Sequence, residues 1–325
     1  MNMKSAWIVF GVTLLITLPT RLYQIFFLMD KETGFYTDGS TTTAIISIGL
    51  IVGILLIMAM GTLNRQAPKA YSPIHSSLVA VISVLTGLSL IIASAVDLFG
   101  NSSSQNHFMY MILSFVGILA GAVFILAGYD FAVGQNSFVK YPLLALLPSL
   151  WGCFCLVALF ITYVAVVNIS ENIYDTFTMI FLLLFLFAQA KLLAGVEDQK
   201  SSRLIYVFGL PAILLSLVTG IPGVILLFAK TNQITAFPFG LHFVTVLMAL
   251  YLFVFLAAVR RTKDAPKISS DEPIAPDEIL PEQKSETRSP ELLEKKNCSE
   301  FLAEAYESKE KFVERTQSPF FASKI

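Results

Sequence analysis

The feature that most constrains the fold is a series of eight long apolar segments between residues 7 and 259, separated by short polar breaks. A helix crosses the hydrocarbon core of a bilayer in about 20 residues, and each segment is long enough to do so. Only 14% of the chain is charged and its mean hydropathy is +0.72, whereas a soluble domain carries about 25% charged residues. The sequence therefore predicts a multi-pass membrane protein whose main partner is the lipid bilayer.

The predicted spans cover residues 7–28, 41–62, 77–99, 107–128, 142–166, 176–196, 204–228 and 240–259. Because the bilayer core holds no water, backbone groups must pair within each segment, and this favours helices. Strands of a membrane barrel would alternate in polarity over about 10 residues, and these segments do not. The predicted fold is all-α, an integral membrane bundle of about eight transmembrane helices (residues 1–259) with a largely disordered cytoplasmic C-terminal tail.

The orientation is predicted from lysine and arginine, which collect on the cytoplasmic side of membrane proteins. If the N-terminus is cytoplasmic, ten such residues lie on that side close to the ends of the spans: Lys4, Arg65, Lys69, Lys140, Lys200, Arg203, Arg260, Arg261, Lys263 and Lys267. The outer loops then hold only Lys31 and Lys230. Since an even number of spans returns the chain to its starting side, both termini are predicted to be cytoplasmic at the cell membrane.

The tail differs sharply from the spans, because residues 260–325 hold 26 of the 45 charged residues. Residues 260–290 are rich in Pro, Glu, Ser and Lys, a composition typical of a disordered linker. A Ser-Pro pair then precedes residues 291–316 and is typical of a helix start. That segment is predicted to be either an amphipathic helix that binds a cytoplasmic protein partner or a solvated, marginal helix. Residues 317–325 are predicted to be disordered.

The first span is unusual because its polar residues form one stripe. Thr13, Thr17, Arg21 and Gln24 recur at helical spacing and therefore share a face. An arginine at mid-bilayer costs about 2.5–3.5 kcal/mol on insertion scales. The sequence therefore predicts that something compensates the charge of Arg21.

Asp97, toward the outer end of the third span, is the predicted partner of Arg21. Arg21, Gln24 and Asp97 together form the candidate intramembrane polar site. In the alternative, the Arg21 side chain reaches the membrane surface or pairs with backbone carbonyls that Pro19 frees.

Prolines and glycines mark two candidate helix breaks. One is Pro19 in the first span, and the other is formed by Gly220, Pro222 and Gly223 in the seventh. Unwound backbone inside a membrane is tolerated only against protein or water, so the breaks would mark a cavity in the outer leaflet. The alternative is a kink that improves packing.

Two Gly-xxx-Gly patterns predict close packing of helices. They are Gly49–Gly53 in the second span and Gly117–Gly121 in the fourth. Small residues let helix backbones approach each other where water cannot drive association. We interpret both patterns as packing sites rather than as proof of a dimer.

The motifs of common enzymes and cofactor sites are absent. The sequence lacks G-x-S-x-G, H-E-x-x-H, G-x-x-x-x-G-K-[ST] and G-x-G-x-x-G. No catalytic, cofactor-binding or metal-binding residue is therefore predicted, although His107 and His242 could meet in a weak metal or proton site. Cys153 and Cys155 point to nearly opposite helix faces and are predicted to fill space. No long basic run is present that would bind nucleic acid.

The segment Pro19-Thr20-Arg21-Leu22-Tyr23-Gln24, followed by Glu32-Thr33-Gly34-Phe35-Tyr36, resembles a stretch of uncharacterised bacterial multi-pass membrane proteins. The resemblance covers residues 19 to 36 and implies no activity. It does imply that Arg21, Gln24 and the Thr33–Tyr36 loop form one feature at the outer face.

Among specific roles, a transporter-like or permease-like bundle is the leading hypothesis. It depends on the Arg21 stripe and on the candidate break in the seventh span. The alternative is a membrane sensor or scaffold that acts through its charged cytoplasmic tail.

Overall fold

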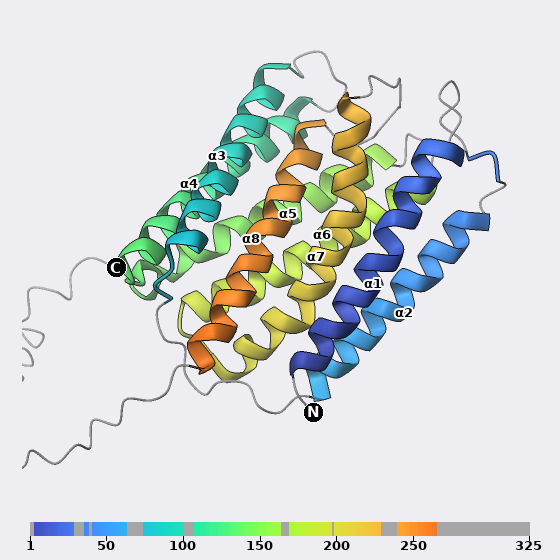
Figure 1. Ribbon diagram of the computed structural model, residues 1–325. Helices are drawn as coiled ribbons and strands as arrows, with labels where there is room; N and C mark the ends of the chain where they lie inside the picture. The colour runs from blue at the N-terminus through green and yellow to red at the C-terminus, as the bar shows by residue number, and fades with distance from the viewer. Residues whose placement is uncertain are drawn as a thin grey trace, which may run out of the picture. The chain divides into compact units, whose positions relative to one another are not determined.

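The computed structural model describes residues 3–28, 36–38, 41–63, 74–100, 107–163, 169–196, 198–228 and 239–264. Nearly all of these residues are helical (Figure 1). The helices are α1 (Met3–Tyr23), η1 (Gln24–Leu28), α2 (Thr41–Leu63), α3 (Ser77–Gly100), α4 (His107–Val133), η2 (Ser137–Val139), α5 (Pro142–Tyr163), α6 (Ile169–Leu193), α7 (Asp198–Phe228) and α8 (Phe239–Asp264). Of these, η1 is a π-helix that continues α1, and η2 is a short 3₁₀ helix.

Eight of the helices in this described part, α1 (with η1) to α8, are long and apolar enough to cross a membrane. This confirms the predicted all-α bundle, and the chain is a multi-pass membrane protein. Several helices extend beyond the predicted spans, because their polar ends remain helical past the apolar core. Helix α7 begins at Asp198 rather than at residue 204, and α8 continues to Asp264 rather than ending at residue 259.

The first residues of the predicted tail linker, up to Asp264, are therefore helical, and the prediction of disorder from residue 260 is wrong there. The chain divides after Pro266 into the helical unit and a second unit, residues 267–325. The rest of the predicted linker, the candidate helix over 291–316 and residues 317–325 all lie outside the described residues.

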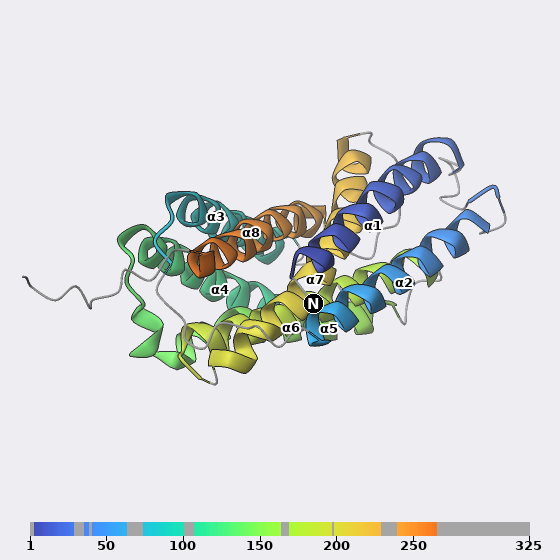
Figure 2. The same cartoon turned by 60° about the horizontal axis from the view of Figure 1, so that its bottom comes forward.

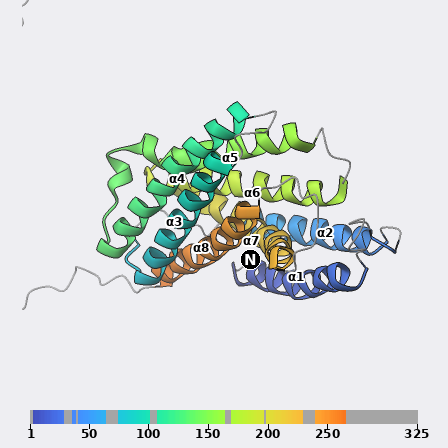
Figure 3. The same ribbon diagram turned by 90° about the horizontal axis from the view of Figure 1, so that it is seen from above.

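Six helices form a closed ring. Each helix from α3 to α8 packs on the next one along the chain, and α8 packs back on α3. The hairpin of α1 and α2 packs mainly against one helix of that ring, α7. Figure 2 and Figure 3 show the hairpin at the side of the ring that holds α7, away from α4. We call these two parts the six-helix ring and the α1–α2 hairpin.

Helix α7 is the central element, because it packs on α1, α2, α6 and α8. In its membrane-spanning window 78% of the residues are buried, against 22% and 28% in the windows of the two hairpin helices. A helix that is apolar on all sides suits such a position. The hairpin instead exposes large apolar side chains such as Leu15 (76% exposed) and Ile16 (61%). Apolar surface of this extent is expected to face lipid.

The helical unit has two ends. We call the end where α1 begins and α8 ends the terminal end, and the other the opposite end. Backbone and side-chain contacts join the helices at the terminal end: Asn136 Nδ2 donates to the Leu193 carbonyl at 2.8 Å, and Ser76 N to the Phe131 carbonyl at 3.1 Å. The end of α1 and the start of α2 lie at the opposite end (Figure 1).

The Gly-xxx-Gly patterns make contacts within the chain. A Cβ atom on Gly53 would lie 2.5 Å from Thr13 Cγ2, and one on Gly121 would lie 2.7 Å from the carbonyl oxygen of Gly87. Real Cβ atoms essentially never come this close to another heavy atom. These glycines therefore allow α2 to pack on α1, and α4 on α3.

The predicted helix breaks are wrong. Helix α1 continues through Pro19, and α7 continues through Gly220, Pro222 and Gly223. The two glycines instead admit α8: a Cβ on Gly220 would lie 2.7 Å from Val246 Cγ2, and one on Gly223 would lie 2.7 Å from His242. The two glycines thus allow α8 to pack closely on α7.

Candidate functional site

Arg21 is the one charged residue in the sequence of the first span (residues 7–28), and it is buried. Only 1% of its surface is exposed, although most of its helix faces outward. It lies on the last turn of α1, immediately before the π-helix η1. Thr17, one turn earlier, is also buried and donates to the Thr13 carbonyl at 2.8 Å. The predicted polar stripe is therefore a buried face of this helix.

Hydrogen bonds connect Arg21 to both helices of the hairpin. Its Nη1 donates to Gln24 Oε1 at 2.6 Å and to the Tyr36 hydroxyl at 3.0 Å. Gln24 Nε2 in turn donates to Thr43 Oγ1, on α2, at 2.5 Å. Gln24 is completely buried, and both polar atoms of its amide are used. The chain of bonds fixes the direction in which the guanidinium group points.

The backbone explains why these side chains meet. Gln24 opens the π-helix, a wider turn that is frequent at functional sites. Tyr36 is held close to the end of this π-helix by its neighbour Thr37. Both the backbone N and the hydroxyl of Thr37 donate to the Leu28 carbonyl, at 2.8 and 3.0 Å. Asp38 Oδ2 then accepts from Thr42 N at 2.8 Å, which satisfies one of the free backbone donors in the first turn of α2.

Two aromatic rings flank the charge. The Arg21 Cζ atom lies 5.1 Å from the centroid of the Tyr174 ring and 5.9 Å from that of Tyr36. A desolvated cation over an aromatic face gains about 2 kcal/mol or more. The Tyr174 hydroxyl also lies 2.6 Å from Ser47 Oγ and donates to the Thr43 carbonyl at 3.3 Å.

Tyr174 belongs to α6, a helix of the six-helix ring. The site therefore lies where the ring meets the α1–α2 hairpin, at the opposite end of the helical unit. We call Arg21, Gln24, Tyr36, Thr43, Ser47 and Tyr174 the Arg21 cluster. The joint feature of Arg21, Gln24 and the loop that the resemblance implied includes Tyr36, while Thr33 to Phe35 lie outside the described residues.

The structure does not bring Asp97 to this site. Helix α3, which carries Asp97, packs on α4 and α8, whereas α1 packs on α2 and α7. Helix α8 lies between α1 and α3 in Figure 1 and Figure 3. The predicted Arg21–Asp97 pair is therefore wrong, because equal depth in the membrane does not make two helices neighbours.

Sequence reasoning missed Tyr174, Thr43 and Ser47. A usable signal existed, because Thr43 and Ser47 are four residues apart in an apolar span, as are Tyr174 and Thr178. Such pairs form short polar stripes that face other helices. Tyr174 contacts Arg21, Thr43 bonds Gln24 and Ser47 bonds Tyr174. These contacts depend on which helices are adjacent, and no stripe reveals that.

No group of three or more His, Cys, Asp or Glu residues that could hold a metal ion occurs among the residues that the structure describes. His242 is buried on α8 beside Gly223, whereas the side chain of His107, its candidate partner, lies outside the described part.

Comparisons with protein-family models, with curated proteins and with solved structures find no match to this chain.

Proposed function

We propose that this protein is a transporter-like membrane protein that recognises an anionic group at the Arg21 cluster. The observation that carries the proposal is a guanidinium that is 1% exposed in a membrane-spanning helix. Ionisable residues inside membranes are costly and usually mark substrate pathways or ligand sites. The planar guanidinium matches the geometry of a carboxylate or phosphate group.

The position of the cluster supports this role. Transporters commonly bind substrate between two structural parts and move one part against the other. Here the cluster takes Arg21, Gln24, Thr43 and Ser47 from the α1–α2 hairpin and Tyr174 from the six-helix ring. The hairpin packs mainly on α7, so it could shift relative to the ring without separating any pair of ring helices.

The candidate break in the seventh span no longer supports this role, since α7 is continuous. The proposal keeps the predicted orientation, with both termini cytoplasmic. In that orientation the Arg21 cluster lies in the outer half of the bilayer, and an anion would reach it from outside.

The experiment is a flux measurement in proteoliposomes that contain the full chain. Radiolabelled phosphate, succinate and glutamate are the probes, and Arg21→Lys is the test variant because it keeps the charge and loses the planar fork. Thr20→Ala is the matched control, since Thr20 is partly exposed on the same turn and bonds its own helix through the Ile16 carbonyl. We expect uptake of at least one probe, a loss of about tenfold in Arg21→Lys, as one lost charged hydrogen bond implies, and no loss in Thr20→Ala.

Two results would overturn the proposal. One is the absence of flux of every probe through the wild-type protein. The other is equal flux through wild type and Arg21→Lys, which would show that the guanidinium does not contact the solute.

The alternative role, a sensor or scaffold that acts through the tail, is favoured by the concentration of 26 of the 45 charged residues in residues 260–325. A truncation after Pro266 removes the second unit and leaves every described helix intact. A transporter should keep its flux after this truncation, whereas a scaffold should lose its association with cytoplasmic proteins.

A further inference from the structure

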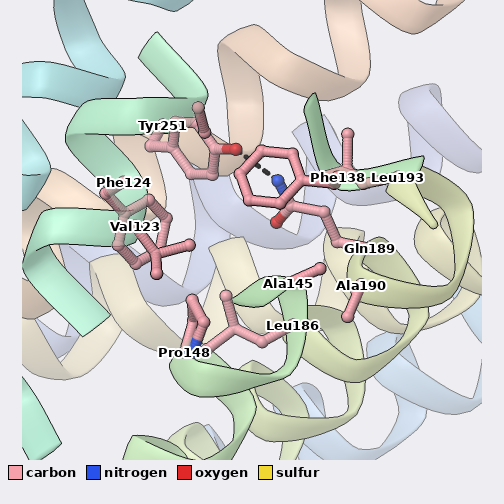
Figure 4. Close-up of a pocket in the computed structure, with 11 residues that line it drawn as sticks. Val123, Phe124, Phe138, Ala145, Pro148, Leu186, Gln189, Ala190, Leu193 and Tyr251 are labelled. Carbon is pink, nitrogen blue, oxygen red and sulfur yellow. Dashed lines mark hydrogen bonds between the residues drawn. The ribbon is translucent and has the colours of Figure 1, made fainter. Parts of the chain in front are cut away.

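A second buried polar group lies inside the six-helix ring, far from the Arg21 cluster in the sequence. It lines a small cavity of about 20 Å³, and Figure 4 shows the residues around it. The lining residues come from α4, η2, α5, α6 and α8, and all of them are buried: Val123, Phe124, Ala127, Phe138, Ala145, Pro148, Leu186, Gln189, Ala190, Leu193 and Tyr251.

Gln189 is the polar residue of this lining that has an open hydrogen-bonding atom. Its side chain is 5% exposed, and its Nε2 donates to the Tyr251 hydroxyl. Its Oε1 is buried and has no hydrogen-bond partner. Figure 4 shows this oxygen turned away from Tyr251, into the space among the lining residues. A buried acceptor without a donor costs free energy, so the site favours a molecule that supplies one.

Phe138 closes the cavity at the terminal end. It lies on the three-residue helix η2, between α4 and α5, and is 1% exposed. The loop is held by Asp130, whose Oδ2 accepts from Ser137 N at 2.8 Å and whose Oδ1 accepts from Ser137 Oγ at 2.9 Å. Asn136 Nδ2 adds a bond to the Leu193 carbonyl at 2.8 Å. These side-chain bonds can break while α4 and α5 stay in place, so Phe138 is suited to act as a lid.

We propose that this cavity is a binding site for a small, uncharged, largely apolar molecule with one hydrogen-bond donor, and that Phe138 is its lid. The donor binds Gln189 Oε1, and the apolar body occupies the space that the Phe138 ring vacates. With the lid closed, the cavity has room for about one water molecule. A buried water needs two to four polar partners, and of the lining side chains only those of Gln189 and Tyr251 are polar. An apolar molecule with a single donor therefore suits this lining better than water does.

The charge of the ligand also follows from the lining. None of the eleven lining residues is an Asp, Glu, Lys, Arg or His. A charge placed among apolar walls without a counter-charge would be strongly unfavourable. The site therefore differs in chemistry from the Arg21 cluster and does not depend on the proposed transport of anions.

Phenol is a suitable probe, because it combines an aromatic body of the size of the Phe138 ring with one donor. Anisole has the same ring and an acceptor but no donor, and it is the matched control ligand. Saturable binding to the purified full-length protein would be measured from the shift of the unfolding midpoint and, with fluorinated analogues, by ¹⁹F NMR. We expect phenol to bind roughly fivefold to tenfold more tightly than anisole, as one hydrogen bond implies.

Two variants locate the effect. Phe138→Ala enlarges the cavity and should strengthen phenol binding, whereas Phe177→Ala, a change of the same kind at a half-exposed position on α6, should not. Gln189→Leu removes the acceptor and should make the affinities for phenol and anisole equal.

Three results would overturn the proposal. The first, which needs no variant, is equal binding of phenol and anisole to the wild-type protein, or tighter binding of anisole. The second is a preference for phenol that persists in Gln189→Leu. The third is a response to phenol that Phe138→Ala and Phe177→Ala change to the same extent.

Discussion

Gln24 and Gln189 are the same residue type, and both are buried in membrane-spanning helices, yet their surroundings differ. Gln24 uses both amide atoms, accepting from Arg21 and donating to Thr43. Gln189 uses only its nitrogen, which donates to Tyr251, and its oxygen has no partner. The difference follows from charge. A buried guanidinium requires acceptors around it, because an uncompensated charge is very costly, whereas a neutral amide can leave one acceptor open at a smaller cost.

The comparison suggests different tasks for the two ends of the helical unit. The Arg21 cluster combines a charge, two aromatic rings and a chain of hydrogen bonds, an arrangement that suits the proposed recognition of an anion by electrostatics. The Gln189 cavity combines apolar walls with one acceptor, an arrangement that suits the proposed recognition of a ligand by shape and by one hydrogen bond. If this contrast is right, substitutions around Arg21 should destabilise the protein more than the matching substitution at Gln189.

The largest effect is expected for Gln24→Leu. The substitution removes the acceptor of Arg21 Nη1 and the donor to Thr43. Because hydrogen bonds to charged groups contribute about 1.5–3 kcal/mol, we expect the free energy of unfolding to fall by about 2–3 kcal/mol. Reversible denaturation in mixed micelles measures it. A loss below about 0.5 kcal/mol, the level of a neutral surface change, would mean that Arg21 is not held by Gln24.

Gly53→Ala tests whether the hairpin that carries Arg21 is as tightly packed as the structure shows. The new Cβ would lie 2.5 Å from Thr13 Cγ2, and overpacking typically costs about 1–3 kcal/mol. Gly11→Ala is the matched control, because nothing lies within 4 Å of its Cβ position, and replacing glycine within a helix should stabilise it by about 0.5–1 kcal/mol. Equal effects of the two substitutions would contradict the packing of α1 on α2.

Tyr36→Phe separates the hydroxyl from the ring. The variant loses the 3.0 Å hydrogen bond from Arg21 but keeps the ring 5.9 Å from the charge. A hydrogen bond to a charged group would be worth up to about 3 kcal/mol, but Tyr36 is only partly buried, so a loss of about 1 kcal/mol is expected. If the free energy of unfolding of Tyr36→Phe equalled that of the wild type, Tyr36 would contribute through its ring alone.

The smallest effect is expected for Gln189→Leu, the same substitution as at Gln24. It removes one hydrogen bond to Tyr251 and at the same time removes the unpartnered oxygen. Since these effects oppose each other, the free energy of unfolding should change by less than about 1 kcal/mol. If Gln189→Leu proved as destabilising as Gln24→Leu, the contrast between the two glutamines would be wrong.

Much of the fold could be predicted from the sequence, because the bilayer imposes span length and helical structure. The polar stripe of Thr17, Arg21 and Gln24 was also visible, since helical spacing alone puts these residues on one face. The partners of Arg21 were not predictable in the same way. Asp97 has a suitable charge and depth, but α8 lies between its helix and α1, and adjacency of helices is a property of packing.

The glycines and prolines of α7 show the same limit. Gly220 and Gly223 are compatible with an unwound turn and with close contact to α8, and the structure shows the second. The cavity beside Gln189 was hidden for a related reason. A glutamine in an apolar span signals a buried contact, but the loop that places Phe138 over it carries no such signal.

The proposed architecture requires lipid around α1 while the polar stripe of this helix stays buried. Nitroxide labels at Val12, Leu15 and Ile16, compared with a label at Thr17, test this directly in lipid vesicles. The first three are 55%, 76% and 61% exposed, and Thr17 is 4% exposed. Collision rates with oxygen should be high at the first three positions and low at Thr17, with little access for a water-soluble nickel reagent at any of them. Access of the nickel reagent to Leu15 or Ile16, or oxygen collision rates that are equal at all four positions, would contradict the account.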